Sequence, residues 1–108
     1  MALEVGPWRG ESLPLVIPVT NSRTGEPITD PMEVRIWLER PNGTILADKT
    51  LTGTEVEHLG GPENPDDNGR FRAVFVPDAS GVHIARSTVT GPDGLQKSSR
   101  VVFEIHKL

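Results

Sequence analysis

The 108-residue chain contains no cysteine and no tyrosine, and it has no long apolar run. Without cysteine the chain can form neither disulfide bonds nor a thiolate metal site, which favours synthesis in a reducing cytosol. No segment approaches the roughly 20 apolar residues of a membrane-spanning helix. The N-terminus also lacks the basic stretch and apolar run of a secretion signal. The sequence therefore predicts a protein that is neither inserted in a membrane nor exported.

Clusters of one charge are also lacking. Fifteen acidic and eleven basic residues give a formal charge of -4, and no run of like charge could track a phosphate backbone or an anionic membrane. Nucleic acid and membrane surfaces are therefore not expected as partners. The length suits one domain, because it suffices for a single core and is too short for two.

The pattern that is present is an alternation of apolar and polar residues with a period of two, typical of strands with one buried face. Helical periodicity never extends beyond one turn. Turn-forming residues separate segments at residues 12–20, 32–39, 45–52, 70–77, 82–90 and a last strand ending near 105, with a shorter one at 54–59. We predict an all-β antiparallel sandwich of about seven strands over residues 12–108, preceded by an N-terminal arm of residues 1–11.

Two prolines place the first predicted strand at the edge of a sheet. Pro14 and Pro18 lack backbone N–H donors on the same side of the strand, which a central strand could not tolerate. The segment 82–90 is ambiguous, because two alternating sets compete for its inner face. We favour the set that contains His83, Ala85, Ser87 and Val89 over the set that contains Val82 and Ile84.

The predicted core consists of the apolar residues that share the inner phase of these strands. They are Leu13, Leu15, Ile17, Val34, Ile36, Leu38, Phe71, Phe75, Val101, Phe103 and Ile105.

Residues suited to catalysis or metal binding are few and scattered. His58, His83 and His106 show no spacing that would place two ligands on one face. The acidic loop of residues 63–68 is the only concentration of oxygen ligands, but it lacks the pattern of a calcium-binding loop, so a solvated turn is the favoured interpretation. The sequence predicts no enzyme, no cofactor and no metal.

Several short motifs occur in the order found in bacterial and bacteriophage immunoglobulin-like domains. They are RGES at residues 9–12, TGEPI at 24–28, RPNGT at 40–44, NGRFRAVF at 68–75 and DASGVH at 78–83. The chain resembles that family over about residues 9–106. The resemblance implies an immunoglobulin-like (Ig-like) β-sandwich, and a histidine, His83, stands where the family often has a tyrosine.

Such domains occur in surface adhesins, in enzymes acting on polysaccharides and in phage particles, so the fold leaves function open. A separate domain without a secretion signal or cysteine is similar to the small structural proteins of tailed-phage virions. This resemblance implies a head decoration or head-tail accessory protein, made in the bacterial host cytoplasm and bound to capsid or head-tail subunits or to further copies of itself. The alternative is a carbohydrate-binding or adhesive module of a bacterial surface protein.

Two tryptophans are not assigned to the core by the strand phases. Trp8 lies in the arm beside Arg9, and Trp37 lies on the polar phase of its strand beside Arg35. Tryptophan and arginine are enriched at binding hot spots. We therefore predict partner contacts at Trp8, Arg9, Arg35 and Trp37. For Trp37 the alternative is a ring that lies over neighbouring aliphatic stems, and for Trp8 a ring folded over the end of its own sandwich.

Overall fold

The computed structural model describes residues 10–105, and within them the chain forms seven β-strands and one short 3-10 helix. The elements are β1 (Leu13–Pro18), β2 (Glu33–Glu39), β3 (Ile45–Thr50), β4 (Glu57–His58), η1 (Pro65–Asp67), β5 (Arg70–Phe75), β6 (Gly81–Thr90) and β7 (Gln96–Ile105). None of the described elements is a helix of the length and hydropathy needed to cross a membrane. The predicted strands are confirmed, and the seventh is the two-residue β4.

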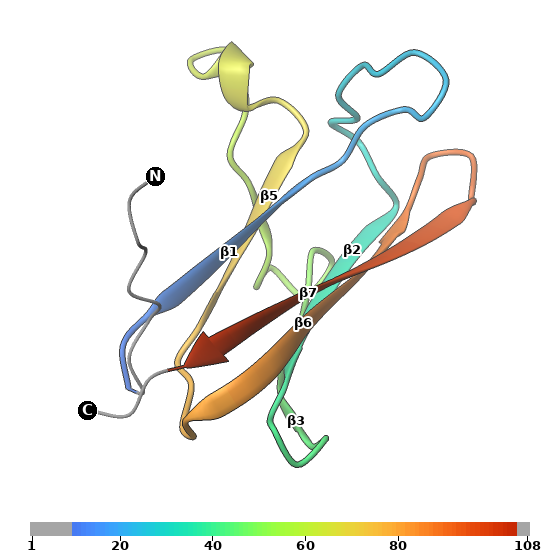
Figure 1. The fold of residues 1–108 in the computed structure, drawn as a ribbon. Helices are drawn as coiled ribbons and strands as arrows, with labels where there is room; N and C mark the ends of the chain where they lie inside the picture. Colours follow the sequence, from blue (N-terminus) through green and yellow to red (C-terminus); the bar gives the residue numbers. More distant parts are fainter. Residues whose placement is uncertain (1–9, 106–108) are drawn as a thin grey trace, which may run out of the picture.

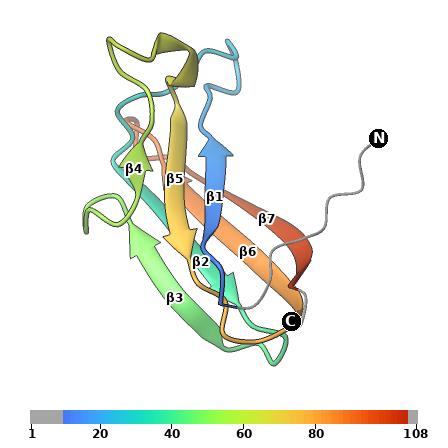
Figure 2. The same ribbon diagram turned by 90° about the vertical axis from the view of Figure 1, so that its left-hand side faces the viewer.

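The strands form two antiparallel sheets that pack face to face (Figures 1 and 2). One sheet has the order β1-β5-β4 and the other has the order β3-β2-β6-β7. The chain crosses between the sheets after β1, β3 and β5, whereas β2 and β3, β4 and β5, and β6 and β7 pair within one sheet. The predicted all-β antiparallel sandwich is confirmed.

The first strand lies at a sheet edge, as its prolines predict. β1 pairs only with β5, with Pro14 opposite Val74 and Pro18 opposite Arg70. The N–H of Val19, one residue past the strand, donates to the Gly69 carbonyl at 2.7 Å, so the odd-numbered residues face β5. The two prolines therefore lie on the free side, where no ladder bond is lost.

The core lies between the sheets and contains most of the predicted residues. Six of the eleven are buried: Val34, Ile36, Leu38, Phe71, Phe75 and Ile105. The inner phase favoured for β6 is also confirmed, because His83, Ala85 and Ser87 are buried. Leu15 and Ile17 from β1 and Phe103 from β7 are half-buried against this cluster, and Leu13 is half-buried at the start of β1.

The prediction that Val101 belongs to the core is wrong. Its side chain is 60% exposed, although it has the same phase as the buried Ile105. The reason is the open side of the sandwich: β1 and β7 are both edge strands, and no described strand covers the space between them. Phase assigns a side chain to a face of its sheet, but only the opposite sheet can bury it.

One histidine anchors the loop that precedes β5. The Gly69 N–H donates to Nε2 of His58 at 3.0 Å, and the ring of His58 stacks on Phe71 with centroids 4.7 Å apart. Val56 is buried in the core and holds the start of the same segment. This loop therefore has two inward contacts, while Glu63 and Asp66 remain exposed.

Candidate functional site

The candidate site is the outer face of the four-stranded sheet, which we call the β2 face. Along β2 the buried residues Val34, Ile36 and Leu38 alternate with residues that point away from the core. Arg35 and Trp37 belong to this outward set. Because antiparallel neighbours share a face with the residue opposite, the pairing of β2 with β3 and β6 determines what surrounds them.

Arg35 links Trp37 to the neighbouring strand. Its Nε donates to both carboxylate oxygens of Asp48 on β3, at 2.8 and 2.9 Å, and its guanidinium lies 4.5 Å from the centroid of the Trp37 ring. Asp48 is the direct cross-strand partner of Trp37. The hydrogen bonds from Arg35 lower the pKa of Asp48 and, reciprocally, raise the pKa of Arg35. Since the pair is solvent-exposed, its main effect is to hold the guanidinium over the ring.

A second ion pair lies on the other side of Trp37. Arg86 of β6 is directly opposite Trp37, and its Nε donates to both carboxylate oxygens of Glu39 at 2.9 Å. The half-buried indole therefore lies between two arginines that are each fixed by a carboxylate. Arg100 of β7 lies opposite Arg86 and has no ion-pair partner among the described residues.

Two more carboxylates accept hydrogen bonds at the two ends of this sheet. Burial of Glu33 opposes its ionisation, but hydrogen bonds from Thr52 and from the N–H groups of Val34 and Leu51 together lower its pKa. At the other end, Nε and Nη2 of Arg40 donate to Asp78 at 2.9 Å and lower the pKa of that carboxyl. These contacts attach the loops at both ends of β2 and β3 to the sheet.

The β2 face continues into exposed apolar residues. Ile45 and Ile84 are both opposite Glu39, and Val102 is opposite Ile84, so the three lie on one side of the sheet. Val82 precedes Ile84 by two residues and shares that side. Ile45, Val82 and Val102 are 49%, 53% and 54% exposed, so these residues form an apolar patch beside the charged residues around Trp37.

The predicted contact residues divide into two groups. Arg35 and Trp37 are in contact on the β2 face, whereas Trp8 and Arg9 lie outside the described residues. The polar phase of β2 also places Glu39 beside Trp37, but sequence reasoning missed Asp48 and Arg86, because their place beside Trp37 depends on strand register. The turn at residues 41–44 was a usable signal, since it pairs β2 with β3.

The acidic loop and the histidines do not form a metal site in the described part of the chain. No group of three or more histidine, aspartate or glutamate side chains in residues 10–105 is arranged to hold an ion. His83 is completely buried, with Nδ1 2.9 Å from the Gly81 carbonyl and no hydrogen-bond partner at Nε2.

We expect a chelator to leave the melting temperature unchanged, because no described group links metal binding to folding. Thermal unfolding with and without EDTA checks this. A decrease of several degrees would identify residues 63–68 as a calcium site.

Comparison of the chain with protein-family models, curated proteins and solved structures finds no match.

Proposed function

We propose that this protein is a non-catalytic interaction module of a bacteriophage particle, a head decoration or head-tail accessory protein that binds its partner through the β2 face. The observation that carries the binding proposal is the composition of this face: a half-buried tryptophan, two arginine-carboxylate pairs and an adjoining apolar patch. Protein interfaces combine aromatic and arginine anchors with apolar surface in this way.

The rigidity of the β2 face supports the proposal. Trp37, Arg35 and Arg86 lie on two adjacent strands of the four-stranded sheet. Arg35 donates three hydrogen bonds to Asp48, and Arg86 donates two to Glu39. A preformed surface loses less side-chain freedom when a partner binds. A flat and open sheet face suits a protein surface better than a small ligand, which needs a concave site.

The assignment to a phage particle rests on the resemblance of the short motifs to phage and bacterial immunoglobulin-like domains. On this proposal the protein is made in the bacterial host cytoplasm and joins the virion by binding capsid or head-tail subunits.

The alternative is a carbohydrate-binding or adhesive module, for which an open aromatic ring would be the expected platform. Here the Arg35 guanidinium lies over the Trp37 ring, so part of that ring is already covered. This arrangement favours a protein partner. Retention of the purified protein on immobilised polysaccharide, with loss of retention on substitution of Trp37, would favour the alternative.

We expect the Trp37→Ala variant to bind particles that lack the protein about 30-fold more weakly than the parent, a loss of about 2 kcal/mol. The reason is that alanine removes the aromatic anchor and the support for the Arg35 side chain. A binding titration measures the effect.

Val74→Ala is the matched control, because Val74 is an exposed apolar residue on the other sheet. Its binding should equal that of the parent, and melting curves of both variants exclude unfolding as the cause. If Trp37→Ala binds as the parent does, the β2 face is not the interface, and the arm with Trp8 and Arg9 becomes the candidate.

A further inference from the structure

We propose that two copies of this protein associate through β7, whose free edges pair antiparallel around a two-fold axis and join the two four-stranded sheets into one. This inference does not depend on the phage assignment. It concerns the open side of the sandwich and the edge strand β7, which borders the β2 face and is separated from β2 by β6.

The free edge of β7 carries unused backbone hydrogen-bonding groups. The Gly91 N–H donates to the Leu95 carbonyl at 2.9 Å and closes the β6-β7 hairpin. Because bonded pairs recur at every second residue of an antiparallel ladder, the odd-numbered residues of β7 bond to β6. The even-numbered residues from Gln96 to Glu104 therefore direct their N–H and C=O groups outward. Within the described chain, β7 ends the order β3-β2-β6-β7, so no further strand pairs with them.

The two edges of the open side differ in their capacity to accept a strand. β1 carries Pro14 and Pro18 on its free edge. These residues lack backbone N–H donors, so that edge is poorly suited to pair with another strand. β7 is ten residues long and contains no proline. Proline is one device that protects a long exposed edge, so β7, which has none, is the edge that is open to another strand.

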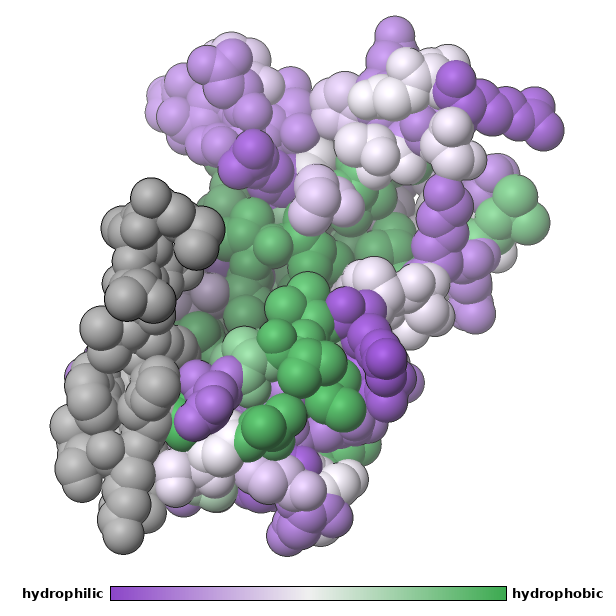
Figure 3. Space-filling view, in the orientation of Figure 1, coloured by the Kyte–Doolittle hydropathy of each residue, from purple (hydrophilic) through white to green (hydrophobic). Residues whose placement is uncertain are grey.

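Apolar surface accompanies this edge on both faces of the strand. Val101 and Val102 are 60% and 54% exposed, and the space between β1 and β7 is a hollow of about 180 Å³ lined by Leu15, Ile17, Ile36 and Val101. Figure 3, which looks onto this side, shows hydrophobic residues over β7 and behind it toward the interior. Pairing of two β7 edges would bring the two hollows together and cover the exposed valines.

The charges on β7 select one register. Two-fold symmetry requires that even-numbered residues, whose backbone groups face the edge, pair with even-numbered residues. If Val102 pairs with Val102 of the second copy, Arg100 lies opposite Glu104 of the second copy, and Glu104 lies opposite its Arg100. Shifting the axis to Val101 would place Arg100 opposite Val102 and Glu104 opposite Ser98, which leaves both charges unpaired. Shifting it to Arg100 would place two arginines opposite each other, which is unfavourable.

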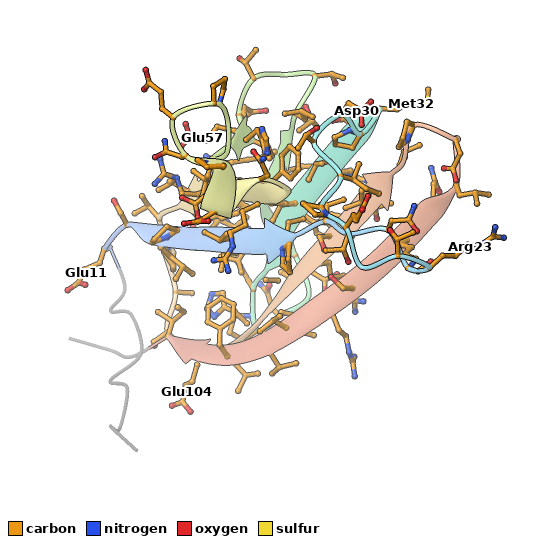
Figure 4. The ribbon with its side chains drawn as sticks, turned by 90° about the horizontal axis from the view of Figure 1, so that it is seen from above. Glu11, Arg23, Asp30, Met32, Glu57 and Glu104 are labelled. Atoms are coloured by element: carbon orange, nitrogen blue, oxygen red, sulfur yellow. The ribbon has the colours of Figure 1, made fainter. Side chains whose placement is uncertain are left out.

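Neither charge has an ion-pair partner in the described part of the molecule. Arg100 and Glu104 lie about 13 Å apart along the strand, since each residue advances it by about 3.3 Å. No ion pair among the described residues involves either one. Figure 4 shows the Glu104 side chain pointing away from the rest of the sandwich. The selected register supplies a partner to both residues in both copies.

A two-fold axis perpendicular to the sheet leaves the two β2 faces on the same side of the joined sheet. Both copies of the Trp37 cluster would then face a common surface. If the β2 face binds a repeating surface, binding of one copy raises the effective concentration of the second copy's β2 face at that surface. The dimer then binds more tightly than one copy does.

The test is charge reversal at β7, measured by sedimentation equilibrium of the full chain over a wide concentration range. We expect the parent to reach twice the mass of one chain. Arg100→Glu and Glu104→Arg should each raise the dimer dissociation constant about tenfold or more, because each places like charges opposite each other at two symmetric positions. An equal mixture of the two variants should recover the heterodimer, since every pair then has opposite charges again.

Arg23→Glu is the control, because it makes the same charge change at an exposed position in the loop between β1 and β2, outside β7. It should dimerise as the parent does. A parent that remains monomeric at every concentration overturns the proposal. A dimer that is indifferent to both reversals, or a mixture that fails to recover, also overturns it. These outcomes do not involve the particle-binding assay, so they are independent of the proposed function.

Discussion

Replacing Phe71 with alanine is expected to lower the free energy of unfolding by about 3 to 5 kcal/mol, because the large side chain leaves a cavity that its neighbours cannot close. Phe71 is 1% exposed and lies on β5, the central strand of its sheet. Its ring also supports the stacked ring of His58. A domain of this size has only about 5 to 15 kcal/mol of stability in total.

Urea unfolding of the parent and the variant measures the loss from the midpoint and slope. Phe103→Ala is the comparison, because Phe103 is only half-buried beside the open side of the sandwich. Its loss should be clearly smaller than that of Phe71→Ala. Equal losses would mean that the open side is packed as tightly as the core, contrary to the structure.

Replacing Gly69 with alanine is expected to cost about 3 kcal/mol or more, from two sources that add. Gly69 has a φ of +81°, a conformation that a side chain disfavours. A Cβ atom there would also lie 2.7 Å from Cβ of Pro27 and 2.8 Å from the Val19 carbonyl oxygen. Both neighbours belong to the connection between β1 and β2, which is held by hydrogen bonds from Ile28 N–H to the Val19 carbonyl and from Val19 N–H to the Gly69 carbonyl, so neither can move aside easily.

Gly43→Ala separates the two sources. Gly43 has a similar φ of +86°, but nothing lies within 4 Å of the position of its Cβ. The Gly43→Ala variant should therefore lose only the stability that the unfavourable φ costs, about 1 to 2 kcal/mol. Thermal or urea unfolding of both variants provides the comparison, and equal losses would show that the close contacts at Gly69 are relieved at no cost.

The secondary structure and most of the core could be predicted from local patterns. The alternation in β2 and β5 identified Val34, Ile36, Leu38, Phe71 and Phe75 as buried, because a side chain in a strand points to one face with a period of two. Pro14 and Pro18 identified an edge strand, since a missing N–H can be tolerated only where no neighbour needs it.

The residues around Trp37 could be predicted only in part. Phase placed Arg35 and Trp37 together on the outer side of β2, because they are two residues apart in one strand. The positions of Asp48 and Arg86 beside them follow from the registers of β3 and β6, which join residues 11 and 49 positions away from Trp37. The turn at residues 41–44 indicates that β2 pairs with β3, but no local pattern encodes the register between β2 and the distant β6.

What the sequence by itself determined is the direction in which each side chain leaves its strand, because the alternation is a local property of extended backbone. What only the tertiary structure decided is which of those side chains are covered. Ile105 and Val101 have the same phase on β7, yet one is 1% and the other 60% exposed. Burial requires a second sheet above the residue, and the edge strands β1 and β7 leave the space above Val101 open.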